Sequence, residues 1–153
     1  MSILSPQTAE RVEPALIQTM VDEGLARYQP DPGCWYSVDG LPYGYDIHAP
    51  GVETDPEELD LVERAAGVMM ACEIGLHIFV SDAAGRPTLA RMAQQAARRT
   101  DGWVFVEFHR PPSPGLLEYL DDAGGCLRLD EAVYLDAAAM SAWNTHPDFH
   151  VVK

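Results

Sequence analysis

The stretch that decides the fold runs from Ile74 to Phe108 and reads IGLHIFVSDAAGRPTLARMAQQAARRTDGWVFVEF. Its first seven residues are apolar at nearly every position, which indicates a strand covered on both faces. Turn residues follow, and from Arg86 the apolar side chains recur with the spacing of an amphipathic helix. Gly102 ends this helix, since glycine readily takes the left-handed conformation of a helix end. Aromatic and β-branched residues from Trp103 onward predict a second strand. A strand, a helix and a strand within about thirty-five residues predict a crossover between neighbouring parallel strands.

The rest of the chain predicts further helices and short strands. Apolar residues at helical spacing predict helices from about Pro14 to Arg27 and from Thr54 to Met70, and shorter ones from Leu116 and from Ala137. An earlier start of the first helix, near Pro6, stays open, and Pro14 would then lie in its interior and kink it. Strands are predicted at 34–38, 43–49, 126–129 and 132–135, and Ile3–Leu4 is either a short edge strand or a loose end.

These elements predict one domain, residues 1–153, because no linker or internal repeat divides the chain. The expected fold class is α+β. A mixed β-sheet of about five to seven strands should carry its helices mainly on one face, and should include the β-α-β crossover of Ile74–Phe108.

Composition excludes several classes of function. With 24 acidic and 10 basic residues the net charge is −14, which argues against nucleic-acid binding because phosphate contacts need a basic surface. No run of about twenty apolar residues predicts a membrane span, and the first residues do not resemble a secretory signal. Three widely separated cysteines, Cys34, Cys72 and Cys126, are typical of reduced thiols, so we expect a cytoplasmic protein.

The acidic residues are unevenly distributed. Eleven of them lie between Asp22 and Glu63, where Arg27 is the one basic residue, while four arginines lie on the helix that begins at Arg86. One interpretation is that the acidity keeps the protein soluble. The other is that it forms an acidic face that docks a basic partner, with the arginine helix as the positive face on the far side.

Motifs for catalysis or metal binding are lacking in the sequence. There is no G-x-S-x-G, no phosphate-binding glycine loop and no signature around a cysteine. His77 and Glu107 lie in predicted strands, where a histidine is more often a core residue than a catalyst. His146, Asp148 and His150 alternate along the chain, but their spacing matches no established zinc site. We therefore expect no catalytic residue, no metal and no cofactor.

Aromatic residues cluster in the same acidic region, at Trp35, Tyr36, Tyr43 and Tyr45. Tyrosine and tryptophan beside carboxylates are typical of tight protein interfaces. A hairpin whose aromatic side chains cover the core explains them equally well.

Two segments resemble an uncharacterised bacterial domain family. One is Ile74–Asp82 followed by the helix that ends in Ala97-Arg98-Arg99 and by Asp101-Gly102-Trp103-Val104; the other is the tail Ala142–Lys153, with Trp143, His146-Pro147-Asp148-Phe149 and Lys153. Such domains resemble the small immunity proteins of polymorphic and secretion-system toxins, which bind a cognate toxin in the cytoplasm. The resemblance covers roughly the C-terminal half, implies no catalytic residues, and leaves about seventy N-terminal residues unmatched, as a variable recognition surface would.

The leading hypothesis is therefore an immunity protein that neutralises a cognate toxin with a basic active-site cleft by direct stoichiometric contact. Tyr43 or Tyr45 should be the apolar anchor, and the acids of the following helix should form the rim. The predicted partner-binding residues are Trp35, Tyr36, Asp39, Tyr43, Tyr45, Asp46, Glu57, Glu58 and Asp60. Two alternatives stay open: a small hydrolase that reverses a toxin's modification with His77, Glu107 or the terminal histidines, and a non-catalytic subunit that assembles with itself, for instance as a homodimer.

Overall fold

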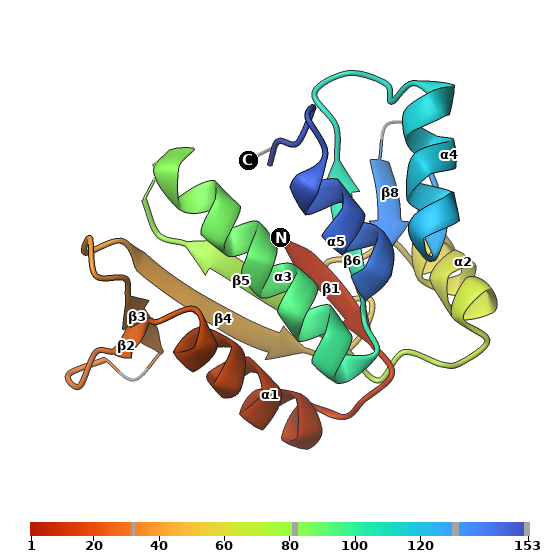
Figure 1. The fold of residues 1–153 in the computed structure, drawn as a ribbon. Helices are drawn as coiled ribbons and strands as arrows, with labels where there is room; N and C mark the ends of the chain where they lie inside the picture. Colours follow the sequence, from red (N-terminus) through yellow and green to blue (C-terminus); the bar gives the residue numbers. More distant parts are fainter. Residues whose placement is uncertain (32, 81–82, 130–131, 152–153) are drawn as a thin grey trace.

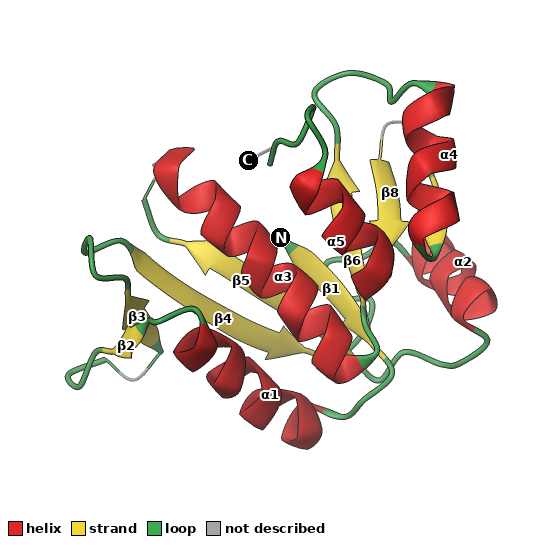
Figure 2. Cartoon of the chain, in the orientation of Figure 1, coloured by secondary structure: helices red, strands yellow, loops and turns green. Residues whose placement is uncertain are grey.

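The computed structural model describes residues 1–31, 33–80, 83–129 and 132–151. These residues form an α+β fold, as predicted, with one eight-stranded sheet and five helices (Figures 1 and 2). The helices are α1 (Ala9–Asp22), α2 (Pro56–Ala66), α3 (Arg86–Thr100), α4 (Pro114–Ala123) and α5 (Ala137–Thr145). The strands are β1 (Ser2–Ser5), β2 (Ala26–Arg27), β3 (Cys34–Tyr36), β4 (Pro42–His48), β5 (Cys72–Ile78), β6 (Trp103–Glu107), β7 (Cys126–Arg128) and β8 (Ala132–Leu135).

The strands lie in the order β2-β3-β4-β5-β1-β6-β8-β7, and every described pair is antiparallel. The sheet is thus antiparallel where a mixed sheet was predicted, and it has slightly more strands than the predicted five to seven. The extra strand is β2, whose two residues were assigned to the end of the first helix.

The strand–helix–strand unit β5–α3–β6 is present, but its two strands are not neighbours. Strand β1 lies between them and pairs antiparallel with both, so that Ile3 is opposite Ile74 on one side and Val104 on the other. The edge strand or loose end expected at Ile3–Leu4 is therefore a central strand. Both side chains are fully buried, and four residues are too few to show this by alternation.

Gly102 ends α3 for a different reason from the one predicted. Asp101 takes the left-handed conformation, with φ 52°, and the Gly102 amide donates to the carbonyl of Ala97. A Cβ at Gly102 would lie 2.7 Å from the Ile3 side chain and 3.1 Å from the Leu4 carbonyl. Glycine is required there because β1 passes close by.

The first helix begins earlier than predicted, at Ala9 instead of about Pro14, and carries Pro14 inside it. A proline within the second turn removes one backbone hydrogen bond. Burial of Val12, Leu16 and Met20 against the sheet holds the helix together despite that loss.

Helices α1, α3, α4 and α5 cover one face of the sheet and α2 lies on the other (Figure 1). Alternation along β1 divides the core accordingly. Ile3 belongs to the main cluster under α3, and Leu4 belongs to a smaller cluster with Val62 of α2 and Tyr134 of β8. The prediction of helices mainly on one face is confirmed.

Two predicted segments lie partly outside the described residues: the turn at Ser81–Asp82 and the end of the tail at Val152–Lys153. In the described part of the chain, no helix combines the length and the apolar character that crossing a membrane requires.

Replacing Ile3 by alanine should lower the free energy of unfolding by about 2–5 kcal/mol, because a fully buried side chain at the centre of the sheet leaves a cavity. Chemical denaturation measures the change. Val38→Ala is the matched control, since Val38 is 94% exposed and should change stability by less than about 0.5 kcal/mol. Equal effects of the two substitutions would contradict a central position for β1.

Candidate functional site

The sheet face that α2 only partly covers carries the most distinctive polar residues of the chain. We call it the open face, and it comprises Asp46, His48, His77, Phe79, Phe105, Glu107 and, from α2, Glu58. Alternation sets these strand residues apart from Tyr45, Ile47, Leu76 and Val106, which pack toward the main cluster on the helix side.

Asp46 bridges two histidines on this face. Its Oδ2 lies at hydrogen-bond distance, 2.5 Å, from Nε2 of His77 on the neighbouring strand. Its Oδ1 lies 2.8 Å from Nε2 of His48, but this contact lacks the geometry of a hydrogen bond. All three side chains are about 40% exposed, so the cluster is open to a partner. Gly75, opposite Asp46 in the ladder, makes room for it, because a Cβ there would lie 2.6 Å from Asp46 Oδ1 and 2.9 Å from His77 Nε2.

Phe79 lies beside this cluster and is the exposed aromatic side chain that the sequence did not reveal. It is 59% exposed and stacks against His77, with ring centroids 6.2 Å apart and an interplanar angle of 29°. Its ring lies over Gly44, where a Cβ would come within 2.7 Å of it. The apolar run of Ile74–Val80 had suggested that Phe79 was buried.

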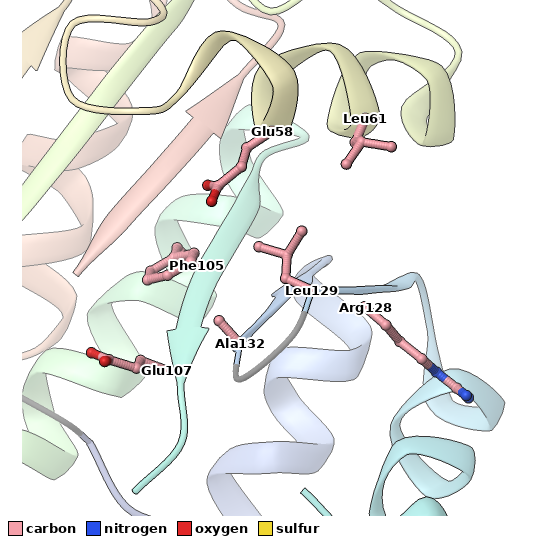
Figure 3. A pocket seen from close by; sticks show the side chains of 7 residues that line it. All are labelled: Glu58, Leu61, Phe105, Glu107, Arg128, Leu129 and Ala132. Atoms are coloured by element: carbon pink, nitrogen blue, oxygen red, sulfur yellow. The ribbon is translucent and has the colours of Figure 1, made fainter. Parts of the chain in front are cut away.

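A hollow of about 530 Å³ lies between α2 and strands β6 and β8 (Figure 3). In it the ring of Phe105 lies between the carboxylates of Glu58 and Glu107 (Figure 3). The hydroxyl of Tyr134 donates to Glu58 Oε2 at 3.4 Å. Burial, together with the nearby Glu58 carboxylate, raises the pKa of Tyr134, so this hydroxyl stays protonated and able to donate. The hollow is lined by Glu58, Leu61, Phe105, Glu107, Arg128, Leu129 and Ala132.

Glu73 is a buried carboxylate that fixes the loop before α2. It accepts hydrogen bonds from the Thr54 hydroxyl at 2.6 Å, from the Ser2 hydroxyl at 3.1 Å, and from the amides of Glu53 and Thr54. Burial on its own would raise the pKa of this carboxyl, but these four donors outweigh it and hold the pKa below its usual value. Glu73 therefore ties β5, β1 and the start of α2 together.

Few basic side chains lie on the open face, where Arg128 of β7 lines the hollow. Strands β1, β4, β5, β6 and β8 contain no Lys or Arg. On the opposite side, Arg91 pairs with Glu23 at 3.1 Å and Arg99 pairs with Asp22, both at the C-terminal end of α1. Of the other two arginines of α3, Arg86 donates to the Val151 carbonyl and Arg98 is exposed.

The predicted partner-binding residues fall into three groups. Trp35 and Tyr43 are 3% and 1% exposed and belong to the core, and Tyr45 is packed against it, so these rings do not offer a surface anchor. Tyr36 contacts Tyr28 edge-on at the sheet's end, and Asp39 is exposed in the hairpin turn. The acids on the α2 side are Asp46 and Glu58 on the open face, and Glu57 and Asp60 exposed on α2, where Asp60 pairs with Arg64.

The residues named for a hydrolase converge only in part: Glu107 and His150 line one hollow of about 210 Å³, and His77 is not among its lining residues. His77 contacts Asp46, whereas Nε2 of His150 accepts the His109 amide and its Nδ1 donates to the Asp148 carbonyl. His146 stacks on Trp143. The terminal histidines therefore secure the tail around Trp143.

Two further kinds of site, a reactive thiol and a metal centre, were compared with the described residues. Burial raises the pKa of the Cys72 thiol, and burial with nearby Asp121 raises that of Cys126 to about 11, so neither is a ready thiolate. Within the described ranges, no group of three or more His, Cys, Asp and Glu side chains is placed to hold a metal ion.

Gly75→Ala should separate Asp46 from the two histidines while leaving the fold intact, because the added methyl would meet only the ends of the Asp46 and His77 side chains. Imidazole ¹⁵N chemical shifts of His48 and His77 should change. Gly115→Ala is the control, since a Cβ there has no neighbour within 4 Å. Unchanged imidazole shifts in Gly75→Ala would contradict the bridged arrangement.

Glu73→Gln should lower the free energy of unfolding by about 2 kcal/mol at neutral pH, because one acceptor oxygen becomes a donor facing other donors. Since folding lowers the pKa of Glu73, its contribution is complete above the usual value of 4.5 and is lost as the pH falls through the folded value. Denaturation at several pH values should therefore show the difference between wild type and Glu73→Gln shrinking in acid. The exposed Glu118→Gln should show no such difference, and a pH-independent gap for Glu73→Gln would contradict the lowered pKa.

Comparison of the chain with protein families, with curated proteins and with solved structures gives no match. The resemblance to immunity proteins therefore stays a prediction. The functional proposal below is based on the chemistry of the open face.

Proposed function

We propose that this protein is an immunity-type inhibitor, which binds a cognate bacterial toxin stoichiometrically and blocks it. The observation that carries the proposal is the open face, where Asp46, Glu58 and Glu107 lie on one side of a sheet whose central strands contain no Lys or Arg. Such a surface complements the basic cleft of a toxin that acts on nucleic acids or nucleotides.

The charge distribution favours rapid and oriented association. The chain carries a net charge of −14, and two of the four arginines of α3 are already paired with acids at the end of α1. An acidic surface attracts a basic partner over a distance and aligns it before contact. An inhibitor of a toxin made in the same cell benefits from such speed.

Phe79 is the apolar anchor of the proposed interface, in place of Tyr43 or Tyr45. It is an exposed aromatic ring with a neighbouring carboxylate at Asp46, and aromatic residues dominate the binding energy of protein interfaces. Glu57 and Asp60 on α2 form the rim.

The cytoplasm is the compartment that fits this function. Cys34, Cys72 and Cys126 are free thiols in the structure, in keeping with a reducing environment. The proposed partner is the protein encoded beside this chain.

Co-expression with that neighbouring protein tests the proposal directly. We expect the two chains to co-elute in gel filtration at a one-to-one ratio, and we expect growth to be rescued from the toxin's effect. Separate elution together with continued growth arrest would contradict the inhibitor role.

Substitutions on the two sides of the sheet then locate the interface. Phe79→Ala and Asp46→Asn should each weaken toxin binding by about 2 kcal/mol or more in calorimetry. Glu57→Gln, at the rim, should mainly slow association and reduce its dependence on salt. Arg98→Ala, on the exposed side of α3, is the control. Full affinity in the first two variants with a loss in Arg98→Ala would place the interface on the helix side.

A further inference from the structure

The hollow beneath α2 continues into a second one. Phe105 and Glu107 line both the hollow of about 530 Å³ and a neighbouring hollow of about 210 Å³, which also includes Ser2 and His150. The two form a trough across the open face, from the first turn of α2 to the C-terminal tail. We refer to this combined feature as the trough.

The chemistry of the trough suits a cation with an apolar stem. Phe105 lies between the carboxylates of Glu58 and Glu107 (Figure 3), and an aromatic face attracts a cation placed over it. Leu61 and Leu129 supply apolar walls on the α2 and β7 side. The hollow thus combines two negative carboxylates beside an aromatic ring with an apolar wall.

The described residues do not already fill this site with a positive charge. Arg128 belongs to the lining, but its guanidinium points away from Phe105 and from both carboxylates (Figure 3). Arg64 pairs with Asp60 on α2, and Arg91 and Arg99 pair with Glu23 and Asp22 at the C-terminal end of α1, outside the trough. The N-terminal ammonium of Met1, which lines the smaller hollow, donates to the Leu76 carbonyl. The two glutamates therefore face the hollow without a cationic partner among the described residues.

A guanidinium fits the space over Phe105, between Glu58 and Glu107, better than an ammonium does. It is planar, so it can stack on the Phe105 ring while N–H groups on its opposite edges reach the carboxylates on either side. An ammonium is compact and strongly hydrated, and it lacks the flat surface for stacking.

We propose that the trough is a binding site for one arginine side chain of a protein partner, with the guanidinium over Phe105 and between Glu58 and Glu107. The identification of that partner as the toxin rests on the proposed function. The arginine site itself is testable without the toxin.

Nuclear magnetic resonance of the ¹⁵N-labelled full chain tests the site with the tripeptide acetyl-Gly-Arg-Gly-amide. We expect millimolar affinity and saturable shifts at the amides of Phe105 and Glu107. The citrulline tripeptide has the same shape without the charge and should cause no shifts, while the lysine tripeptide should bind several-fold more weakly. Shifts with citrulline equal to those with arginine would overturn the proposal, and so would equal affinity for lysine.

Matched substitutions connect the shifts to the trough. Glu58→Gln and Glu107→Gln should each weaken the arginine tripeptide by about threefold, and the double variant should abolish saturable binding. Glu118→Gln removes the same charge from the exposed side of α4 and should leave the affinity unchanged. Equal loss in Glu118→Gln would show a nonspecific effect of net charge and overturn the site. Backbone spectra of each variant verify the fold.

Free L-arginine separates the two sources of a guanidinium. Its α-carboxylate and α-ammonium cancel, so it has the same net charge as the tripeptide, and it should bind more weakly because it lacks the flanking peptide groups that contact the walls of the trough. Tighter binding of free arginine would assign the trough to a small molecule and overturn the protein source. If the toxin co-elutes with the chain but the chain does not bind the tripeptide, the arginine site is contradicted and the inhibitor role is not. Tripeptide binding without co-elution would instead sink the inhibitor role.

Discussion

The pairing of β1 with both β5 and β6 is the interaction on which the rest of the sheet depends. Without it, the β5–α3–β6 unit would have a gap between its two strands and unpaired backbone groups on both sides of that gap. The side chains of β1 also divide the interior into two clusters. Ile3 belongs to the core under α3, and Leu4 belongs to the cluster under α2. Ser2 adds a hydrogen bond to Glu73, which in turn holds the loop that leads into α2.

Carboxylates on the two sides of the sheet have different kinds of partner. On the helix side, acids of α1 meet arginines of α3, and the resulting pairs hold two helices together. On the open face, the carboxylates of Asp46 and Glu58 contact histidines and a tyrosine hydroxyl instead of arginine. A buried carboxylate there, Glu73, is satisfied entirely by neutral donors. Because neutral donors leave the negative charge in place, Glu73 keeps its charge, whereas Asp22 and Glu23 on the helix side are offset by arginines.

The sequence predicted the elements of β5–α3–β6 well, because a fifteen-residue helix with a full apolar stripe and two apolar strands is a strong pattern. It could not reveal where β1 inserts, since four residues carry almost no periodicity. The aromatic hairpin misled for a related reason: the neighbours of Trp35 and Tyr43 in the chain are uncharged and show no clear alternation, so only the tertiary packing decides which side is buried. Gly44 and Gly75 were the available signal, because a strand glycine marks a close approach on its own face. Of the nine predicted contact residues, Asp46 and Glu58 lie on the open face, and Phe79, Phe105 and Glu107 required the structure.

Alternation along β4, β5 and β6 has an evolutionary consequence. Positions 46, 77 and 105 point outward, while the residues beside them in the chain, such as Ile47, Leu76 and Val104, hold the core. Under the proposed function, the outward residues recognise the partner and the inward residues fold the chain, so the two tasks fall on interleaved residues of the same strands. A lineage that exchanged the outward set would then change its partner and keep its scaffold.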